Sequence, residues 1–264
     1  MFRSAARFFL YPSSQAYRFL SYCYNYPAKG HLPKEIQHIN PILKQLSEVN
    51  KKVHFIQVGS NDGITGDPIH HFVQHYQWYG VLIEPMPMLF EQLKKTYEFE
   101  KERLQFLNVA VSADNQKSKT IYCINEKFRG QVPDWYYQLG SFVKEVILKH
   151  NIQNIEDYLV ENQVPVLTIQ HIKETYLTLD SIDFLHIDAE GYDFEILKTL
   201  DFLRNKPSVI LVEYVHLDIA TQKQMLAMFK RNGYTTYRCH LDFIALEQSV
   251  HNRYVQETLI NAAW

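Results

Sequence analysis

Short apolar segments recur along the chain, and stretches with helical spacing of apolar residues separate them. The apolar runs carry few charges and are bounded by glycine, proline or polar residues, which is typical of strands buried on both faces. Their alternation with helices predicts a doubly wound α/β fold with a mostly parallel sheet. The predicted strands cover residues 53–58, 80–84, 104–111, 182–187 and 208–212, and two shorter ones cover 120–124 and 166–169.

Helix start and stop signals lie between these strands. Residues 34–50 have helical spacing, and Pro41 marks either the true start of that helix or a kink. Asp67 is expected to cap the helix after the first strand, with Pro68 at its first position. Four further helices are predicted. One begins at Pro87, a second ends near Tyr176, a third ends near Leu200, and the last extends from Asp218 to Gly233.

One internal segment and the end of the chain break this alternation. Residues 234–239 and 242–246 predict a closing antiparallel pair, and residues 126–163 interrupt the α/β rhythm as an insertion. Insertions at the carboxyl edge of such sheets often shape a substrate pocket. Trp135 and Tyr136 are therefore candidate substrate contacts that could stack on a sugar ring, with an aromatic core plug as the alternative.

Composition narrows the class of protein. An apolar share of 46% over 264 residues suffices for a sizeable core. The 27 basic and 29 acidic residues give a net charge of −2, which gives no support to nucleic-acid binding through a basic field. Three widely separated cysteines without metal-finger spacing favour a reducing, cytoplasmic compartment. No apolar run reaches the roughly eighteen residues that a transmembrane helix needs.

The simplest division of the chain is an N-terminal arm and helix over residues 1–50, followed by one catalytic-type domain over 51–264. Residues 1–27 contain arginines and many aromatics, with no acid before Glu35. This arm either touches a membrane surface or a partner subunit, or lies against its own domain. The sequence does not indicate an oligomeric state.

The sequence FIQVGSNDGIT at residues 55–65 is the most informative local signal. A strand ends there in a glycine-containing loop, and Glu84 follows the second strand, where doubly wound folds hold ribose hydroxyls. A dinucleotide fingerprint needs glycine two positions after Gly59, but Asn61 stands there, and Asp62 repels phosphate while suiting a sulfonium or ammonium group. An ordinary glycine turn is the alternative for this loop.

Ligands of doubly wound sheets bind beyond the carboxyl ends of the strands. Polar and small residues that follow the predicted strands are therefore candidates for a single site. They are Gly59, Ser60, Asn61, Asp62 and Gly63 after the first strand, Glu84 and Pro85 after the second, Ala110, Val111 and Ser112 at the third, Asp188 and Glu190 after the fourth, and Glu213 and His216 after the fifth.

Taken in order, these motifs resemble the FkbM-type family of S-adenosylmethionine-dependent methyltransferases. The resemblance is carried by FIQVGSNDG, VLIEPMPMLFEQL, FLNVAVS, VPVLTI, FLHIDAEGYDFEIL and KPSVILVEYVHL, over about residues 53–217. It implies a Rossmann-like, mostly parallel seven-stranded sheet with helices on both faces and an antiparallel C-terminal strand. It also implies O-methylation of a small-molecule or glycan acceptor, usually a sugar, glycolipid or secondary metabolite.

The resemblance further implies a cofactor site for S-adenosylmethionine. Glu84 would take the ribose hydroxyls, residues 59–63 the methionyl end, and residues 110–112 would lie beside adenine, with Pro85 and Asp188 completing the contacts. Two residues depart from the family's pattern. Gln57 stands where an acid is usual, which bears on the strength of cofactor binding, and His186 stands where lysine more often precedes the IDxEG motif. The second departure leaves open what neutralises the acids around Asp188.

Methyl transfer to an alcohol needs a positioned acceptor and either a base of near-neutral pKa or a metal. His216 is the preferred base, with Asp188 and Glu213 as its catalytic neighbours, whereas capping of a loop is the alternative role for His216. Glu190 is a candidate substrate contact. These acids have no fixed spacing, so a divalent metal is possible but not favoured.

Two other functions stay open. A non-catalytic binding protein that retains the fold is favoured by Gln57 and by the uncertain base. A nucleotide-sugar enzyme is disfavoured by Asn61 and by the missing third glycine. Nothing in residues 126–163 identifies the methyl acceptor, and the fold alone does not fix a substrate.

Overall fold

The computed structural model describes residues 32–36, 38–149, 154–177 and 182–251. Most of the N-terminal arm, and with it the question of membrane or subunit contact, lies outside these residues. Among the described helices, none is long and apolar enough to cross a membrane.

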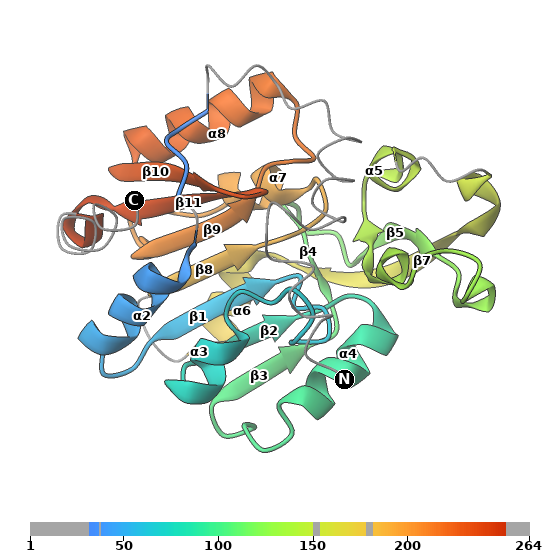
Figure 1. The fold of residues 1–264 in the computed structure, drawn as a ribbon, viewed down its shortest axis with the longest axis horizontal. Helices are drawn as coiled ribbons and strands as arrows, with labels where there is room; N and C mark the ends of the chain where they lie inside the picture. Colours follow the sequence, from blue (N-terminus) through green and yellow to red (C-terminus); the bar gives the residue numbers. More distant parts are fainter. Residues whose placement is uncertain (1–31, 37, 150–153, 178–181, 252–264) are drawn as a thin grey trace.

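A seven-stranded sheet forms the centre of the molecule (Figure 1). Its strands lie in the order β10-β11-β9-β8-β1-β2-β3, and all neighbours from β9 to β3 are parallel. β11 pairs antiparallel with both β9 and β10, which confirms the predicted closing pair. The bounds are β1 His54–Val58, β2 Tyr79–Ile83, β3 Leu104–Leu107, β8 Phe184–Ile187, β9 Val209–Glu213, β10 Tyr234–Cys239 and β11 Asp242–Glu247.

Helices cover both faces of this sheet, as a doubly wound fold requires. One apolar layer joins the sheet to α2 (Asn40–Val49), α3 (His70–His75) and α4 (Pro87–Thr96). The other joins it to α6 (Ile169–Tyr176), α7 (Asp193–Lys198) and α8 (Ile219–Arg231). β1 shows why both layers form, because Phe55 faces the first and Ile56 the second, and both are fully buried. The predicted fold class is confirmed.

Most helix boundaries follow the predicted signals. α2 begins at Asn40 with Pro41 in its first turn, so the proline marks the start and not a kink. Asp218 caps α8 by accepting a hydrogen bond from the Thr221 amide at 2.8 Å. The predicted cap at Asp67 is wrong, because α3 begins only at His70. Asp67 Oδ1 accepts from the Ile69 amide at 2.8 Å in the preceding loop.

The predicted strand over residues 104–111 is two strands in two sheets. β3 ends at Leu107, and Asn108 then donates hydrogen bonds through Nδ2 to the carbonyl oxygens of Glu84, at 2.8 Å, and Pro85, at 3.2 Å. This side chain diverts the backbone away from β2, and β4 (Ala110–Val111) pairs with β7 instead.

The second sheet has the order β4-β7-β5-β6 and lies beyond the arrowheads of the parallel strands in Figure 1. It consists of β4, β5 (Ser118–Ile124), β6 (Gly140–Ser141) and β7 (Leu159–Leu167). Of the short strand predicted at residues 166–169, the first two residues are the end of this longer β7, whereas Thr168 caps α6 and Ile169 begins it. Around the sheet lie α5 (Lys144–Leu148) and three 3₁₀ turns, η2 (Glu126–Phe128), η3 (Asp134–Gln138) and η4 (Ile155–Tyr158). The predicted insertion therefore belongs to a sheet that stands at the carboxyl edge of the first.

Candidate functional site

A cavity of about 290 Å³ lies at the carboxyl ends of the parallel strands. This is close to the lower end of the range for small-molecule sites. Of the sequence-predicted site residues, those that line it are Gly59, Ser60, Asn61, Glu84, Pro85, Ala110, Val111, Asp188, Glu190 and Glu213. Asp62, Gly63, Ser112, Trp135, Tyr136 and His216 are not among the lining residues.

Glu84 is fixed in the cavity wall by backbone donors on both sides. Its Oε2 accepts from the Asn61 amide at 2.8 Å and its Oε1 accepts from the Met86 amide at 2.9 Å. Burial raises the pKa of Glu84 to about 7. Asn108, which sequence reasoning missed, holds the backbone of Glu84 and Pro85 from behind.

Gly59 lies between the ends of β2 and β8, and its lack of a side chain lets the two ends lie close together. A Cβ added at Gly59 would lie 1.9 Å from the Asp188 carbonyl oxygen, and its φ is +77°. The Gly59 amide donates to the Ile83 carbonyl at 3.0 Å, so the residue lies between the ends of β2 and β8. Next to it, the buried Ser60 donates through Oγ to the Gln57 carbonyl and accepts from the Ile83 amide. These two residues bring the loop and Asp188 to one wall.

Asp62 and Gly63 shape the loop and do not face the cavity. Asp62 Oδ1 accepts from the amides of Ile64 and Thr65, at 2.9 and 2.7 Å, and Oδ2 accepts from the Thr65 hydroxyl. A Cβ at Gly63 would lie within 3 Å of Tyr97 and Leu93 side-chain atoms, so this glycine allows the loop to lie against the end of α4. Asn61 has φ +50°, a left-handed conformation that asparagine tolerates.

The residues expected beside adenine separate into two groups. Ala110 and Val111 form β4 and line the cavity together with Val109. Ser112 is fully buried, its amide donates to the Leu167 carbonyl at 2.9 Å, and its hydroxyl contacts Asp114 at 3.2 Å. Ser112 therefore anchors the second sheet and does not belong to the cavity wall.

Gln57 and His186, the two departures from the family pattern, lie side by side on β1 and β8. Gln57 Nε2 donates to Asp67 Oδ1 at 3.1 Å and lies 3.2 Å from His186 Nδ1. Burial lowers the pKa of His186 to about 4, so this imidazole is neutral at neutral pH. His186 therefore does not supply the positive charge that the acids around Asp188 lack.

Asp67 gives this network a pH dependence. Burial raises its pKa to about 6 from an ordinary value of 3.8, so the folded protein binds this proton more tightly than the unfolded chain does. Stability must then fall as pH rises from about 4 to 6. Relative to Asp67→Asn, the wild type is expected to lose at most about 3 kcal/mol of unfolding free energy over that interval. Urea unfolding at a series of pH values checks this, and a difference that stays constant with pH would contradict it.

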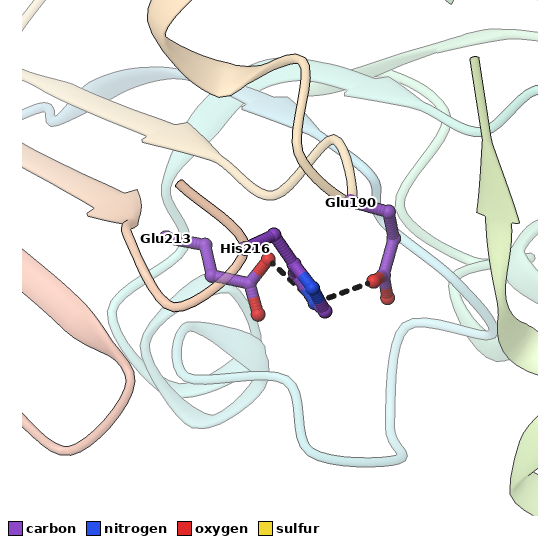
Figure 2. A group of neighbouring side chains, drawn as sticks. All are labelled: Glu190, Glu213 and His216. Carbon is purple, nitrogen blue, oxygen red and sulfur yellow. Dashed lines mark ion pairs between the residues drawn. The ribbon is translucent and has the colours of Figure 1, made fainter. Parts of the chain in front are cut away.

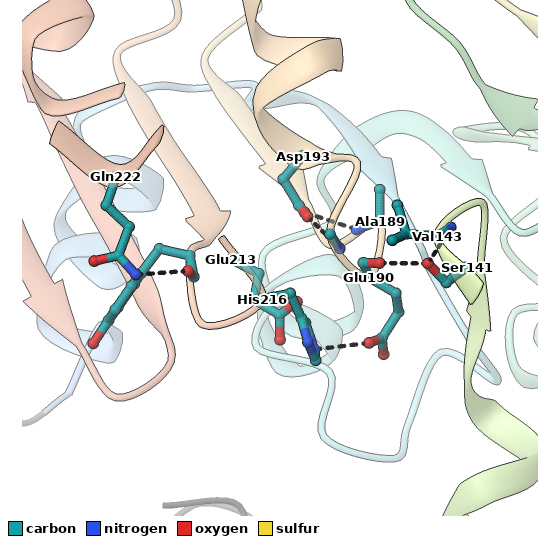
Figure 3. A network of polar contacts seen from close by, with 10 residues as sticks. Ser141, Val143, Ala189, Glu190, Asp193, Glu213, His216 and Gln222 are labelled. Atoms are coloured by element: carbon teal, nitrogen blue, oxygen red, sulfur yellow. Dashed lines mark hydrogen bonds and ion pairs between the residues drawn. The ribbon is translucent and has the colours of Figure 1, made fainter. Parts of the chain in front are cut away.

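The loop after β8 is held in a tight, preformed turn (Figure 3). Asp193 accepts from the amides of Ala189 at 2.8 Å and Gly191 at 2.9 Å, and both of its carboxylate oxygens are thereby used. Glu190 has φ +49°, and its carbonyl accepts from the Ser141 hydroxyl of β6 at 2.6 Å. The second sheet thus fixes the backbone that carries Glu190.

His216 lies between two carboxylates, as Figure 2 shows. Its Nε2 is 2.9 Å from Glu190 Oε2 and 3.4 Å from Glu213 Oε2. The His216 side chain is only 5% exposed, whereas Glu190 and Glu213 reach the cavity. The predicted base therefore lies behind the carboxylates.

The acids at this wall strongly affect one another. Burial, followed by repulsion from Glu190, raises the pKa of Asp188 well above its ordinary value. Burial, followed by repulsion from Asp188, does the same to Glu213. Asp242 also lines the cavity, and burial raises its pKa to about 7. Sequence reasoning missed Asp242, because the predicted pair joined residues 234–239 to 242–246 and did not include the pairing of β11 with β9, which places Asp242 opposite Glu213.

Two groups of these side chains have the composition of a cation site. Glu190, Glu213 and His216 place one ligand atom each within 4.8 Å of one another. Asp188, Asp193 and Glu213 do the same. Glu213 belongs to both groups.

Trp135 and Tyr136 lie away from the cavity lining. Tyr136 is 1% exposed and belongs to an apolar cluster with Tyr137, Leu139 and Ile147, against which Trp135 packs. The two rings stack on each other with centroids 3.8 Å apart. This arrangement fits the core plug and not a sugar platform. From the same segment, Gln138, Gly140 and Phe142 line the cavity instead.

A doubly wound sheet whose first loop and second-strand acid meet in one cavity defines the nucleotide-type α/β class. Within this class, the family described as "Methyltransferase FkbM domain" matches residues 57–236, more than half of the chain. The chain belongs to this family. A search of curated proteins gives no match.

Solved structures are similar at low identity. Methyltransferase FkbM from Methylobacillus flagellatus KT is 13% identical with a TM-score of 0.45, over 74% of this chain and 44% of that one. The N-terminal domain of human METTL16 is 12% identical, with a TM-score of 0.41, over 80% of this chain and 68% of that one. Precorrin-6y C5,15-methyltransferase from Geobacter metallireducens GS-15 is 10% identical, with a TM-score of 0.38, over 78% of this chain and 85% of that one. The chain thus spans less than half the length of the Methylobacillus protein. Similarity at this level carries no argument about substrates.

Proposed function

We propose that this chain is an S-adenosylmethionine-dependent O-methyltransferase that acts on a hydroxyl of a small-molecule or glycan acceptor. The observation that carries the proposal is the anchored carboxylate of Glu84 in the cavity wall. Backbone amides of Asn61 and Met86 fix its two oxygens, and each oxygen keeps a further lone pair. A carboxylate held in this way suits the two neighbouring hydroxyls of a ribose.

The charge of the cavity supports a cationic ligand. Asp188, Glu190, Glu213 and Asp242 line it. Such a wall attracts a sulfonium ion and repels a pyrophosphate. Asn61 also occupies the position at which a dinucleotide would need glycine. These features favour S-adenosylmethionine over the cofactor of a nucleotide-sugar enzyme.

We place the cofactor across the cavity with its ribose on Glu84 and its adenine against residues 109–111. The methionyl end would follow Gly59 to Asn61 toward Asp188. The acceptor hydroxyl would then approach from the side of Glu190 and Glu213. The carbon–sulfur bond breaks as the carbon–oxygen bond forms, the hydroxyl proton passes to the carboxylate of Glu190 or Glu213, and S-adenosylhomocysteine remains. Alignment of the two reactants supplies much of the acceleration, on the order of 7–11 kcal/mol in favourable cases.

His216 takes a supporting role in this proposal. Its ring lies behind Glu190 and Glu213, so it acts on the acceptor through these carboxylates and positions them. Asp188, Glu190 and Glu213 are the groups that would meet the acceptor or the sulfonium directly. This changes the role that the sequence suggested for His216 but keeps its place in the site.

Transfer of a labelled methyl group tests the proposal. The wild-type protein is incubated with S-adenosylmethionine labelled in its methyl group and with pools of glycans, glycolipids or small metabolites. We expect label in products that resist mild alkali, because ethers survive treatment that cleaves methyl esters, and no transfer by Glu84→Ala. Label confined to nitrogen or to alkali-labile esters would exclude O-methylation. Cofactor binding without any transfer would favour a non-catalytic binding protein.

A further inference from the structure

Side chains from the ends of β8 and β9 form a compact group at the cavity wall (Figures 2 and 3). Glu190, Glu213 and His216 each bring one ligand atom within 4.8 Å of the others, and an Asp188 oxygen lies within the same distance of one from Glu213. The sequence did not favour a metal because these residues have no regular spacing. The fold removes that objection, since parallel strands end at the same edge of the sheet.

Apart from the ion pairs of Glu190 and Glu213 with His216, the carboxylates of this group lack the partners that buried acids usually have. Asp188 Oδ1, Glu190 Oε2 and Glu213 Oε2 are inaccessible to solvent, and no hydrogen bond satisfies them. The Glu213 side chain is nine-tenths buried and directed at His216. Among the described ion pairs, none joins these acids to a lysine or arginine. Buried like charges without a cation are costly, so the group is incomplete without added positive charge.

The distances between the ligand atoms of this group match those in the coordination shell of a single metal ion. Glu190 Oε2 and Glu213 Oε2 lie 2.9 and 3.4 Å from the same nitrogen, His216 Nε2. Neighbouring ligand atoms of an octahedral ion, with bonds of about 2.1 Å, are about 3 Å apart. Small adjustments of these side chains would therefore place all three atoms around one cation.

The surrounding structure holds these ligands in place. Ser141 accepts from the Val143 amide at 2.9 Å and donates to the Glu190 carbonyl, so β6 fixes the backbone of that ligand (Figure 3). Asp193 ties the same loop through the amides of Ala189 and Gly191. In metal sites in general, hydrogen bonds of this kind orient the residues that coordinate the ion.

We propose that Glu190, Glu213 and His216 bind one divalent cation at the acceptor side of the cavity, with Asp188 beside it. The two carboxylates suit Mn²⁺ or Mg²⁺, which prefer oxygen ligands, and the imidazole nitrogen favours the transition ion Mn²⁺ over Mg²⁺. The role of the ion rests on the proposed function, because it would polarise the acceptor hydroxyl and so take the part that the sequence gave to a base. Binding of the ion does not depend on that role.

Mn²⁺ itself is the probe, followed by electron paramagnetic resonance and by the melting temperature without any cofactor. We expect the wild type to bind one Mn²⁺ and to melt several degrees higher with it. Glu213→Gln should bind at least tenfold more weakly and gain no melting temperature from the ion. Without metal this variant should be at least as stable as the wild type, because one of the repelling charges is gone. The control Glu195→Gln removes a half-exposed acid on α7 and should bind as the wild type does.

The outcomes separate the two proposals. Absence of Mn²⁺ binding by the wild type at millimolar concentration, or equal binding by Glu213→Gln, overturns the cation site. If S-adenosylmethionine still binds in that case, the proposed function stands without the metal. If Mn²⁺ binds as described but S-adenosylmethionine does not, the site is supported and the proposed function fails. If neither binds, both proposals fail.

Discussion

Replacement of Glu84 by alanine is expected to weaken the binding of S-adenosylmethionine at least a hundredfold. In the proposed complex, the change removes two charge-assisted hydrogen bonds to the ribose, each worth about 1.5–3 kcal/mol, and a loss of about 3 kcal/mol already corresponds to more than a hundredfold. It also leaves the Asn61 and Met86 amides without their acceptors. Isothermal titration with S-adenosylmethionine and S-adenosylhomocysteine measures the effect.

Two further variants keep this test specific. Glu91→Ala removes a mostly exposed acid from α4, close to Glu84 in the chain, and should bind the cofactor as the wild type does. Glu84→Gln keeps the shape of the side chain and should fold, yet bind at least tenfold more weakly, because an amide oxygen can replace only one of the two acceptors. An affinity of Glu84→Ala within threefold of the wild type would show that the ribose lies elsewhere.

Replacement of Gly59 by alanine is expected to destabilise the protein by about 3 kcal/mol or more. The new Cβ would lie 1.9 Å from the Asp188 carbonyl oxygen, a backbone atom that moves only with the end of β8. Forced overpacking costs roughly 1–3 kcal/mol, and left-handed backbone adds about 1–2 kcal/mol for a residue with a side chain. Urea unfolding gives the loss, and soluble yield reports it if the variant does not fold.

Gly66→Ala is the matched control for Gly59→Ala. Gly66 has φ +71°, close to the +77° of Gly59, but a Cβ there would meet nothing within 4 Å. Only the conformational part of the cost should remain, about 1–2 kcal/mol. Equal destabilisation by the two substitutions would show that the contact with Asp188 does not constrain the loop.

The sequence predicted the central sheet well because buried parallel strands leave a strong signal. Runs such as the one around Phe55 and Ile56 are apolar at every position, since both faces of the strand are covered. Pro41, Pro87 and Asp218 marked helix starts through local stereochemistry that tertiary contacts did not override.

The errors in the fold arose where one side chain redirects the backbone. Residues 104–111 read as one strand because nothing in their hydrophobic pattern marks a break at Asn108. The break depends on hydrogen bonds from Asn108 to carbonyl groups that lie 23 and 24 positions earlier in the chain. Similarly, Asp67 has the composition of a cap, but the bond that it accepts from Gln57 belongs to a contact between β1 and the loop.

At the site, the sequence located the strand ends but not the direction of each side chain. Glu84, Asp188 and Glu190 were expected together, and parallel strand ends do bring them to one cavity. Asp62 is satisfied within its own loop, and His216 lies behind the carboxylates, because loop geometry decides which side faces the cavity. No periodicity in the sequence encodes that choice.

The central claim is that the cavity beside Glu84 is the cofactor site. A crystal structure of the protein grown with S-adenosylhomocysteine tests this most directly. We expect density with the ribose hydroxyls within hydrogen-bond distance of the Glu84 carboxylate and the adenine against residues 109–111. Density for the ligand elsewhere on the protein, or with its ribose turned away from Glu84, would contradict the assignment.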